Sequence, residues 1–228
     1  MALPHDRSGL LWNDGPTARF TKSMERWINA MYSDDPSDTD VITAGQSVSR
    51  IIAKEDGVLS GRPVLDYLIE NYCNGATTEW NFTEGQGFQK GQEIASIVAK
   101  SDEILKIERI CMNLITRLSG IASTTSKWSE QLGGVYLAAT RKTNWGVLDK
   151  WAVHIGGGLT HRLDRSDGLM IKENDFSMSK LTLEEILSTF RTATDFPVIE
   201  VVSSDQALSV ANSWIELQYG LSYTYQLT

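Results

Sequence analysis

Short apolar runs alternate with helical patterns through the second half of this 228-residue chain. The runs at residues 134–139, 168–171 and 197–202 are predicted strands, and residues 148–154, 181–192 and 205–211 are predicted helices. Because neighbouring parallel strands need a crossover of about a dozen residues, this alternation is typical of a parallel β/α sheet or barrel. A longer helical pattern leads into it, over residues 101–118 and 121–132, with a predicted break at Ser119–Gly120.

The first half of the chain has a different pattern. Residues 16–33 and 63–72 are predicted helices, and glycines separate strand-like runs at 47–53, 79–82 and 93–99. The chain is therefore predicted to be α/β, with an N-terminal α+β sandwich domain followed by a partial β/α barrel. The predicted domains are residues 1–107 and residues 108–228, the second being incomplete at its C-terminus.

Polar and charged side chains follow the predicted strands of the second half, where β/α folds gather their ligand-binding residues. They are Thr140, Arg141 and Lys142 after the first strand, Lys172 after the second, Glu200 within the third, and His161 and Arg162 on the glycine-rich loop between. Arginine binds a carboxylate through two hydrogen bonds and lysine adds a point charge, so this set suits a small polyanion. Each element also has a plainer interpretation: a solvated Arg–Lys pair, a charged strand edge, an ordinary loop histidine, or a simple turn at glycines 156–158.

Composition argues against several classes of protein. The net charge of −8 makes nonspecific nucleic-acid binding an unfavourable interpretation. No apolar run reaches the roughly 18 residues of a membrane span, and residues 1–15 lack the apolar region of a secretory signal. The use of cysteine favours a reducing, cytoplasmic setting. Cys73 and Cys111 match no metal-ligand spacing and are expected to be buried thiols.

Several longer motifs occur in a fixed order along the chain. They are E-R-x-x-x-N from Glu108, R-L-S-G-I-A from Arg117, T-R-K-T from Thr140, G-G-G-L-T-H-R from Gly156, D-G-L-M-I-K-E-N from Asp167 and E-V-V-S from Glu200. Together with the segments 52–58, 84–85 and 91–92, they resemble the quinolinate phosphoribosyltransferase family from about residue 34 to residue 211.

The resemblance implies an activity and a set of site residues. Members of this family condense quinolinate with 5-phosphoribosyl 1-diphosphate, with Mg²⁺, and form nicotinate mononucleotide, pyrophosphate and carbon dioxide in NAD biosynthesis. By resemblance, the substrates would be bound by Arg109, Thr140, Arg141, Lys142, His161, Arg162, Lys172 and Glu200, with Lys142 and Glu200 as the catalytic candidates. A homodimer or higher homo-oligomer is implied, in which Arg109 reaches the neighbouring subunit's site.

The chain departs from the family pattern at several positions. Ala139 replaces an aspartate, Asn144–Trp145 stands where Thr-Pro is common, Asp175 replaces a histidine, and Val202 replaces a glutamate. Residues 214–228 lack the family's M-L-D-N strand and its glycine-rich phosphate loop, whether that end is natural, a frameshift or a truncation. Because such loops hold phosphates, this chain by itself is expected to turn over quinolinate very poorly or not at all. The alternatives are a noncatalytic fragment or pseudoenzyme of the family, and a molybdenum-transport-associated or nicotinate-using paralogue.

Overall fold

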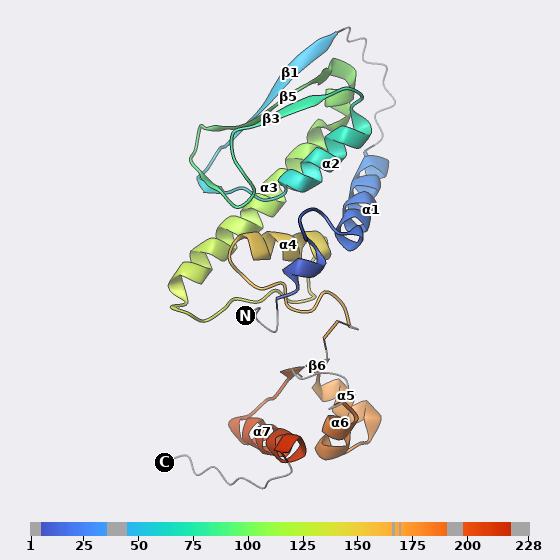
Figure 1. The fold of residues 1–228 in the computed structure, drawn as a ribbon, viewed down its shortest axis with the longest axis vertical. Helices are drawn as coiled ribbons and strands as arrows, with labels where there is room; N and C mark the ends of the chain where they lie inside the picture. The colour runs from blue at the N-terminus through green and yellow to red at the C-terminus, as the bar shows by residue number, and fades with distance from the viewer. Residues whose placement is uncertain (1–5, 36–44, 166, 169, 191–197, 220–228) are drawn as a thin grey trace. The chain divides into compact units, whose positions relative to one another are not determined.

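The computed structural model describes residues 6–35, 45–165, 167–168, 170–190 and 198–219. They belong to two compact units, Met1–His161 and Arg162–Thr228, called unit 1 and unit 2 below. Figure 1 shows helices and strands in both units, which confirms the predicted α/β class. The boundary predicted between residues 107 and 108 falls inside a helix of unit 1 and, as a boundary between family domains, stays a prediction.

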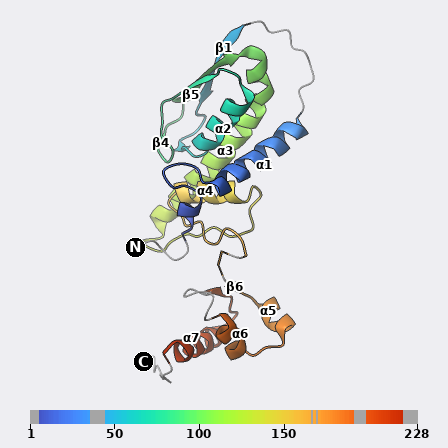
Figure 2. The ribbon, with the colours of Figure 1, turned by 45° about the vertical axis from the view of Figure 1, so that its right-hand side comes forward.

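Unit 1 contains an antiparallel sheet with the strand order β1-β5-β3. Its strands are β1 (Gln46–Ile52), β3 (Thr77–Trp80) and β5 (Glu93–Lys100), and a second, smaller sheet pairs β2 (Gly57–Val58) with β4 (Gly87–Phe88). The central strand β5 buries Ile94, Ala95, Ile97 and Ala99. Helices α2 (Arg62–Tyr72) and α3 (Ser101–Gln131) lie beside the sheet (Figures 1 and 2). The predicted α+β layer is confirmed, although β3 lies slightly N-terminal of the predicted run at 79–82.

Helix α3 is continuous, so the break predicted at Ser119–Gly120 is wrong. Ser119 is buried, and its hydroxyl accepts a hydrogen bond from the N–H of Ser60 (3.1 Å) and donates one to the carbonyl of the same residue (3.1 Å). The buried apolar face continues on both sides of this point, through Ile110, Leu114, Leu118 and Ala122. Packing therefore outweighs the helix-breaking tendency of glycine, which costs about 1 kcal/mol relative to alanine.

Two further helices of unit 1 hold the N-terminal segment against the core. Helix α1 (Ala18–Asp34) begins after Thr17, whose hydroxyl accepts the N–H of Phe20 (3.4 Å). Helix α4 (Val147–Ile155) carries Trp151, whose ring lies 5.2 Å from that of Phe20 and 5.6 Å from that of Trp12. The helices predicted at 16–33 and 148–154 are thus confirmed.

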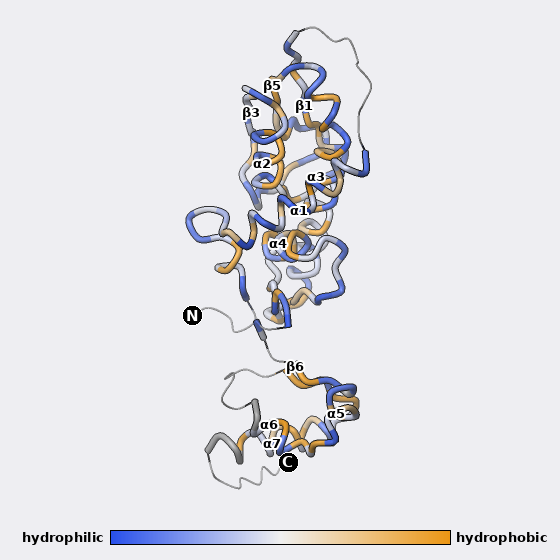
Figure 3. Tube along the Cα trace, turned by 90° about the vertical axis from the view of Figure 1, so that its right-hand side faces the viewer, coloured by the Kyte–Doolittle hydropathy of each residue, from blue (hydrophilic) through white to orange (hydrophobic). Residues whose placement is uncertain are grey.

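Unit 2 contains a parallel pair of short strands, β6 (Met170–Ile171) and β7 (Val198–Ile199). Helices α5 (Glu173–Ser179), α6 (Leu183–Phe190) and α7 (Ser204–Tyr219) surround a small core of Ile171, Ile186, Leu187, Phe176, Leu183, Ile199 and Trp214. Figure 3 shows β6 as a hydrophobic segment, as its burial requires. The helices predicted at 181–192 and 205–211 are confirmed where described, whereas residues 191–197 and 220–228 lie outside the described residues.

Candidate active site

Two segments of unit 1 pair side by side just before the candidate site residues. The N–H of Ala139 donates to the carbonyl of Leu159 (2.8 Å), and the N–H of Leu159 donates to the carbonyl of Leu137 (2.8 Å), in an isolated parallel bridge. Parallel segments end at the same edge, so Thr140–Lys142 and Thr160–His161 leave the bridge together. Within unit 1 the structure thus places Thr140–Lys142 and Thr160–His161 at the same edge of this bridge.

The predicted strand at 134–139 is wrong apart from this bridge. Gly133 and Gly134 have positive φ values of 56° and 97°, which turn the chain away from an extended path. Val135 and Tyr136 remain 67% and 60% exposed. An apolar strand is stabilised by burial of its side chains, and these side chains are not buried, so the apolar pattern alone does not form a strand.

The turn at Thr140–Lys142 presents two cations to solvent. The side chains of Arg141 and Lys142 are exposed, while Ala139 before them is buried. Thr140 Oγ1 accepts a hydrogen bond from the N–H of Lys142 (3.0 Å), which fixes the local turn. Exposed cations on a fixed turn can bind an anion without first breaking a buried interaction.

His161 follows a fully buried threonine and adopts a left-handed backbone. The hydroxyl of Thr160 accepts the N–H of Arg7 (2.6 Å), and its carbonyl accepts Nζ of Lys150 (2.9 Å). His161 has a φ of 52°, a value uncommon outside glycine, asparagine, aspartate and histidine. Lys150 is itself buried on α4 and was not among the predicted site residues.

A run of glycines brings the chain close to α3 before this turn. A Cβ at Gly156 would overlap the carbonyl oxygen of Ala122 and lie 2.7 Å from Cβ of Thr125. A Cβ at Gly158 would lie 3.0 Å from Cγ2 of Thr125, and Gly157 has a φ of 89°. Close packing and turn geometry thus account for glycine at 156–158, and the interpretation of this run as a turn is confirmed.

An ion pair between α3 and α4 fixes the loop that follows the two cations. Asp149 is buried and accepts hydrogen bonds from Nε (2.9 Å) and an Nη (2.8 Å) of Arg117, and from the N–H groups of Asn144 (2.9 Å) and Trp145 (3.0 Å). The hydrogen bond to Asp149 raises the pKa of Arg117. A charged residue inside the otherwise apolar helix 148–154 is the sequence signal for this pair.

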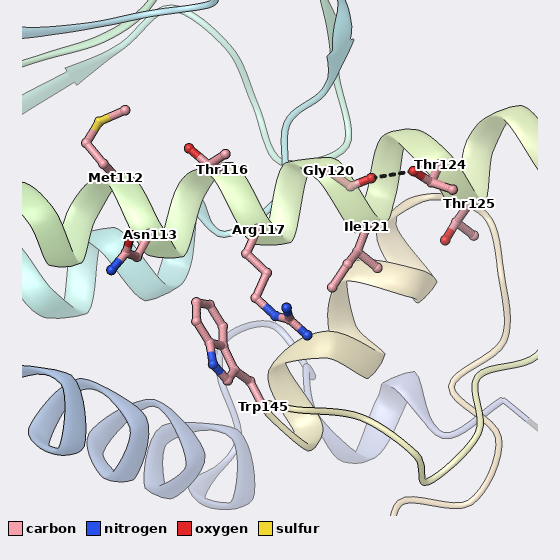
Figure 4. A pocket seen from close by; sticks show the side chains of 9 residues that line it. All are labelled: Met112, Asn113, Thr116, Arg117, Gly120, Ile121, Thr124, Thr125 and Trp145. Carbon is pink, nitrogen blue, oxygen red and sulfur yellow. Dashed lines mark hydrogen bonds between the residues drawn. The ribbon is translucent and has the colours of Figure 1, made fainter.

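An open depression lies along α3 on the same side as this ion pair. Figure 4 shows Arg117 extending from α3 beside the ring of Trp145, and the guanidinium carbon lies 4.8 Å from the ring centroid. The depression has a volume of about 840 Å³ and is also lined by Met112, Asn113, Thr116, Gly120, Ile121, Thr124 and Thr125. Trp145, one of the two residues that stand where Thr-Pro is expected by resemblance, forms this wall.

Arg109 lies further along the same helix. Its side chain is 77% exposed, and its Nε lies 3.4 Å from Oδ2 of Asp35 at the end of α1. A second depression, of about 340 Å³, is lined by Arg109 and shares Met112 and Asn113 with the first. Arg109, Asn113 and Arg117 are four residues apart and so follow one face of α3.

In unit 2, Lys172 and Glu200 meet at the ends of the parallel strands. Met170 and Ile171 pair in parallel with Val198 and Ile199, and the N–H of Glu200 donates to the carbonyl of Ile171 (2.9 Å). Lys172 Nζ lies 3.0 Å from Oε2 of Glu200, with the two side chains 42% and 55% exposed. The expectation that Glu200 lies inside a strand is wrong, because β7 ends at Ile199 and Glu200 follows it.

Arg162 is a buried cation of unit 2. It is 8% exposed, and its Nη atoms donate to the carbonyl of Gly168 (3.0 Å) and contact Sδ of Met170 (3.5 Å). Asp175, which replaces the family's histidine, accepts the N–H of Lys172 (2.8 Å) at the start of α5. In unit 2 the buried Arg162 thus contacts residues at the start of β6, and the partly exposed Lys172 follows its end.

The described part of the chain shows neither a metal-binding cluster nor a membrane-spanning helix. Its side chains include no group of three or more His, Cys, Asp or Glu that could hold a metal ion. None of its helices is long and apolar enough to cross a membrane.

Comparisons with known proteins point to a single family. Residues 38–119 match the model described as Quinolinate phosphoribosyl transferase, N-terminal domain, and residues 121–217 match the C-terminal domain of the same family. Similar curated proteins include quinolinate phosphoribosyltransferase [decarboxylating] 1 of Nicotiana glauca, 31% identical over 71% of this chain and 49% of the relative. A probable nicotinate-nucleotide pyrophosphorylase [carboxylating] of Archaeoglobus fulgidus is 35% identical over 71% of this chain and 64% of the relative.

A solved structure gives the same result for the fold. The crystal structure of NadC from Streptococcus pyogenes is 28% identical, has a TM-score of 0.76, and is matched over 86% of this chain and 73% of that one. The present chain spans about half the length of the plant relatives that it matches.

Proposed function

The chain belongs to the quinolinate phosphoribosyl transferase family, and from this premise we propose that its site serves phosphoribosyl transfer to quinolinate with loss of carbon dioxide. The products would be nicotinate mononucleotide, pyrophosphate and carbon dioxide, as part of NAD biosynthesis. The observation that carries the proposal is the contact of Lys172 with Glu200 at the ends of two parallel strands. Strand ends of this kind are where β/α folds bind their substrates.

The two carboxylates of quinolinate require several cations. In unit 1, Arg141 and Lys142 are exposed on a turn that leaves the same edge as His161. In unit 2, Arg162 donates to the carbonyl of Gly168, ahead of β6, and Lys172 follows that strand. Arginine and lysine are the side chains best suited to bind carboxylates, so within each unit we propose these residues as candidates for quinolinate binding, together with Thr140 and His161 in unit 1.

The ion pair between Lys172 and Glu200 suits an exchange of partners. Both side chains are about half exposed, and exposed ion pairs contribute only about 0–1 kcal/mol, so substrates can separate them at little cost. Lys172 would then contact a quinolinate carboxylate, and Glu200 would accept hydrogen bonds from the ribose hydroxyls. A carboxylate at that position also stabilises positive charge that develops on the ribose carbon.

The reaction itself needs no covalent bond to the protein. The pyridine nitrogen bonds to the ribose carbon as the carbon–oxygen bond to pyrophosphate breaks, and Lys142 would stabilise the negative charge of the departing group. The bond to one carboxyl group then breaks, because its electron pair can move into the positively charged pyridine ring. Magnesium is commonly held by one or two carboxylates and substrate phosphates, so Glu200 would suit a Mg²⁺ ion bound together with the diphosphate, and such an ion would supply charge neutralisation there.

We also propose a homodimer in which α3 lies at the interface. The support is the row of Arg109, Asn113 and Arg117 along open depressions on one face of that helix. Arg109 would reach the partner's site, since its exposed pair with Asp35 is weak. A cytoplasmic location remains part of this proposal, although relatives include chloroplastic and mitochondrial proteins.

Quinolinate binding to the purified chain tests the proposal. Lys172→Met is expected to weaken the affinity about tenfold, which corresponds to one hydrogen bond to a charged group. Lys180→Met, which removes another exposed lysine of unit 2, is the control and should leave the affinity unchanged. Equal affinity for nicotinate, which has one carboxylate, would favour a nicotinate-using relative instead. Release of labelled carbon dioxide from carboxyl-labelled quinolinate, with 5-phosphoribosyl 1-diphosphate and Mg²⁺, then tests the transfer reaction.

A further inference from the structure

The N-terminal segment and helix α4 both bind the residue that precedes His161. The N–H of Arg7 donates to Thr160 Oγ1 (2.6 Å), and Oδ1 of Asp6 lies 3.5 Å from the same hydroxyl. From the other side, Lys150 Nζ donates to the Thr160 carbonyl (2.9 Å). Both the side chain and the backbone of this threonine are therefore held.

Burial makes these contacts specific. Thr160 has no exposed surface, and Lys150 is only 2% exposed. Burial of a hydroxyl, carbonyl or ammonium group without a hydrogen-bonding partner costs free energy. The hydroxyl and carbonyl of Thr160 and the ammonium group of Lys150 therefore stabilise the folded state only while their partners are in place. His161 then continues from Thr160 with a φ of 52°, a conformation that a non-glycine residue rarely keeps unless its surroundings impose it.

The N-terminal segment is anchored independently of Thr160. Asp6 accepts hydrogen bonds from the N–H (3.0 Å) and the hydroxyl (2.8 Å) of Ser8, and its Oδ1 lies 3.7 Å from Nδ1 of His154 on α4. Leu11 is fully buried, and the ring of Trp12 is stacked on Trp151 at 5.6 Å. The segment can therefore act as a fixed support for the turn.

We infer that Asp6, Lys150 and Thr160 are positioning residues, which hold His161 in its left-handed conformation at the edge it shares with Arg141 and Lys142. This inference rests on the proposed function, since it assigns to His161 a part in binding the dicarboxylate. None of the three needs to touch the substrate. Their contribution is to keep the imidazole in one place, which lowers the ordering cost of binding.

The test compares Thr160→Val with Thr160→Ser in the full chain. Valine keeps the shape but removes the hydroxyl, whereas serine keeps the hydroxyl. The readouts are the NMR signals of the His161 ring, identified by comparison with His161→Gln, and the dissociation constant for quinolinate. We expect Thr160→Val to shift the His161 signals and weaken quinolinate binding about tenfold, the effect of one hydrogen bond, and Thr160→Ser to restore both.

A second variant keeps the test decisive if the valine variant unfolds. Asp6→Ala changes a side chain that is 23% exposed and should shift the same His161 signals. The control is Asp56→Ala, because Asp56 also accepts a backbone N–H, from Lys90 (2.8 Å), but in the loop between β1 and β2. Asp56→Ala should change neither readout.

The outcomes separate this inference from the proposed function. Unchanged His161 signals in folded Thr160→Val or Asp6→Ala overturn the inference, as do shifted signals with unchanged quinolinate affinity. If the unaltered chain does not bind quinolinate while the His161 signals still shift, the proposed function fails and the positioning of His161 stands.

Discussion

Replacement of Asp149 by alanine is expected to destabilise unit 1 strongly, although Asp149 is not a candidate ligand for any substrate. Its carboxylate is the common acceptor for two hydrogen bonds from Arg117 and two from the backbone of Asn144 and Trp145. These bonds join α3, α4 and the loop after Lys142. Alanine leaves all four donors without this acceptor.

The magnitude follows from the burial of the two partners. Removal of one partner of a buried ion pair costs about 3–5 kcal/mol, because the other charge is left without compensation. Asp149 is 5% exposed, but Arg117 is 31% exposed and water can partly solvate it, so we expect a value near the lower end, about 3 kcal/mol. At about 2–4 °C per kcal/mol for a chain of this size, the melting temperature should fall by about 6–12 °C.

The pH of the measurement can be chosen from the pKa of Arg117. Its pKa is raised, chiefly by the hydrogen bond to Asp149, so the stabilisation is fully present below the ordinary arginine pKa and is lost only as the pH rises above it. Experiments at neutral pH therefore measure the whole contribution.

Urea unfolding of Asp149→Ala, Arg117→Met and the double variant gives the required free energies. The double-mutant cycle isolates the coupling between the two side chains from the loss of the loop contacts. Asp56→Ala serves as the control, since it removes an aspartate that accepts one backbone hydrogen bond in an exposed loop. A loss of less than about 0.5 kcal/mol for Asp149→Ala, the usual range for surface changes, would refute the assignment of this pair as a structural link.

Three further predictions concern unit 1. Gly156→Ala should lower stability by about 1–3 kcal/mol in urea unfolding, because its Cβ would overlap the carbonyl of Ala122. Burial raises the pKa of Glu84 above its ordinary value of 4.5. The stabilising contribution of the protonated side chain is therefore present below pH 4.5 and is lost as the pH rises through the folded-state pKa. The difference in unfolding free energy between the wild type and Glu84→Gln should shrink from about pH 4 to about pH 7. Burial also raises the pKa of Cys73 to about 11 and that of Cys111 to about 12, so both thiols should react slowly with a thiol reagent at pH 8 until the chain is unfolded.

The sequence predicted the elements whose pattern agrees with their packing. The helices at 16–33, 63–72 and 148–154 have apolar positions at helical spacing, and these positions face the core. The prediction failed where local and tertiary preferences differ. At Ser119–Gly120 a local break signal is overridden by a buried serine bonded to Ser60, and at Val135–Tyr136 an apolar run has no burial to stabilise a strand.

At the candidate site, too, the sequence predicted some features and missed others. The motifs supplied residue types and order, and Lys172 was expected to follow a strand, whereas Glu200 was expected inside one; the structure places both after their strands and brings their side chains into contact. The partners of the buried charges were not foreseen, because they are far apart in sequence: Arg117 binds Asp149, and Lys150 binds Thr160 together with a segment at the N-terminus. A charged residue at an otherwise apolar helix position indicates a buried ion pair or hydrogen bond, but it does not indicate which residue is the partner.

The R-L-S-G-I-A and G-G-G motifs are explained by two contacts of α3, one with the first turn of α4 and one with the glycine that follows its last residue. Arg117, which opens the first motif, binds Asp149 on α4, and the carbonyl of Ala122, which closes it, leaves room only for glycine at 156. The same glycine run then delivers the chain to Thr160 and His161. A shift of α4 relative to α3 would displace both the loop after Lys142 and the turn at His161. The site therefore requires both motifs even if neither contacts a substrate. A side chain larger than glycine at 156 should therefore impair quinolinate binding even where the fold survives, and it should do so through the positions of these two segments.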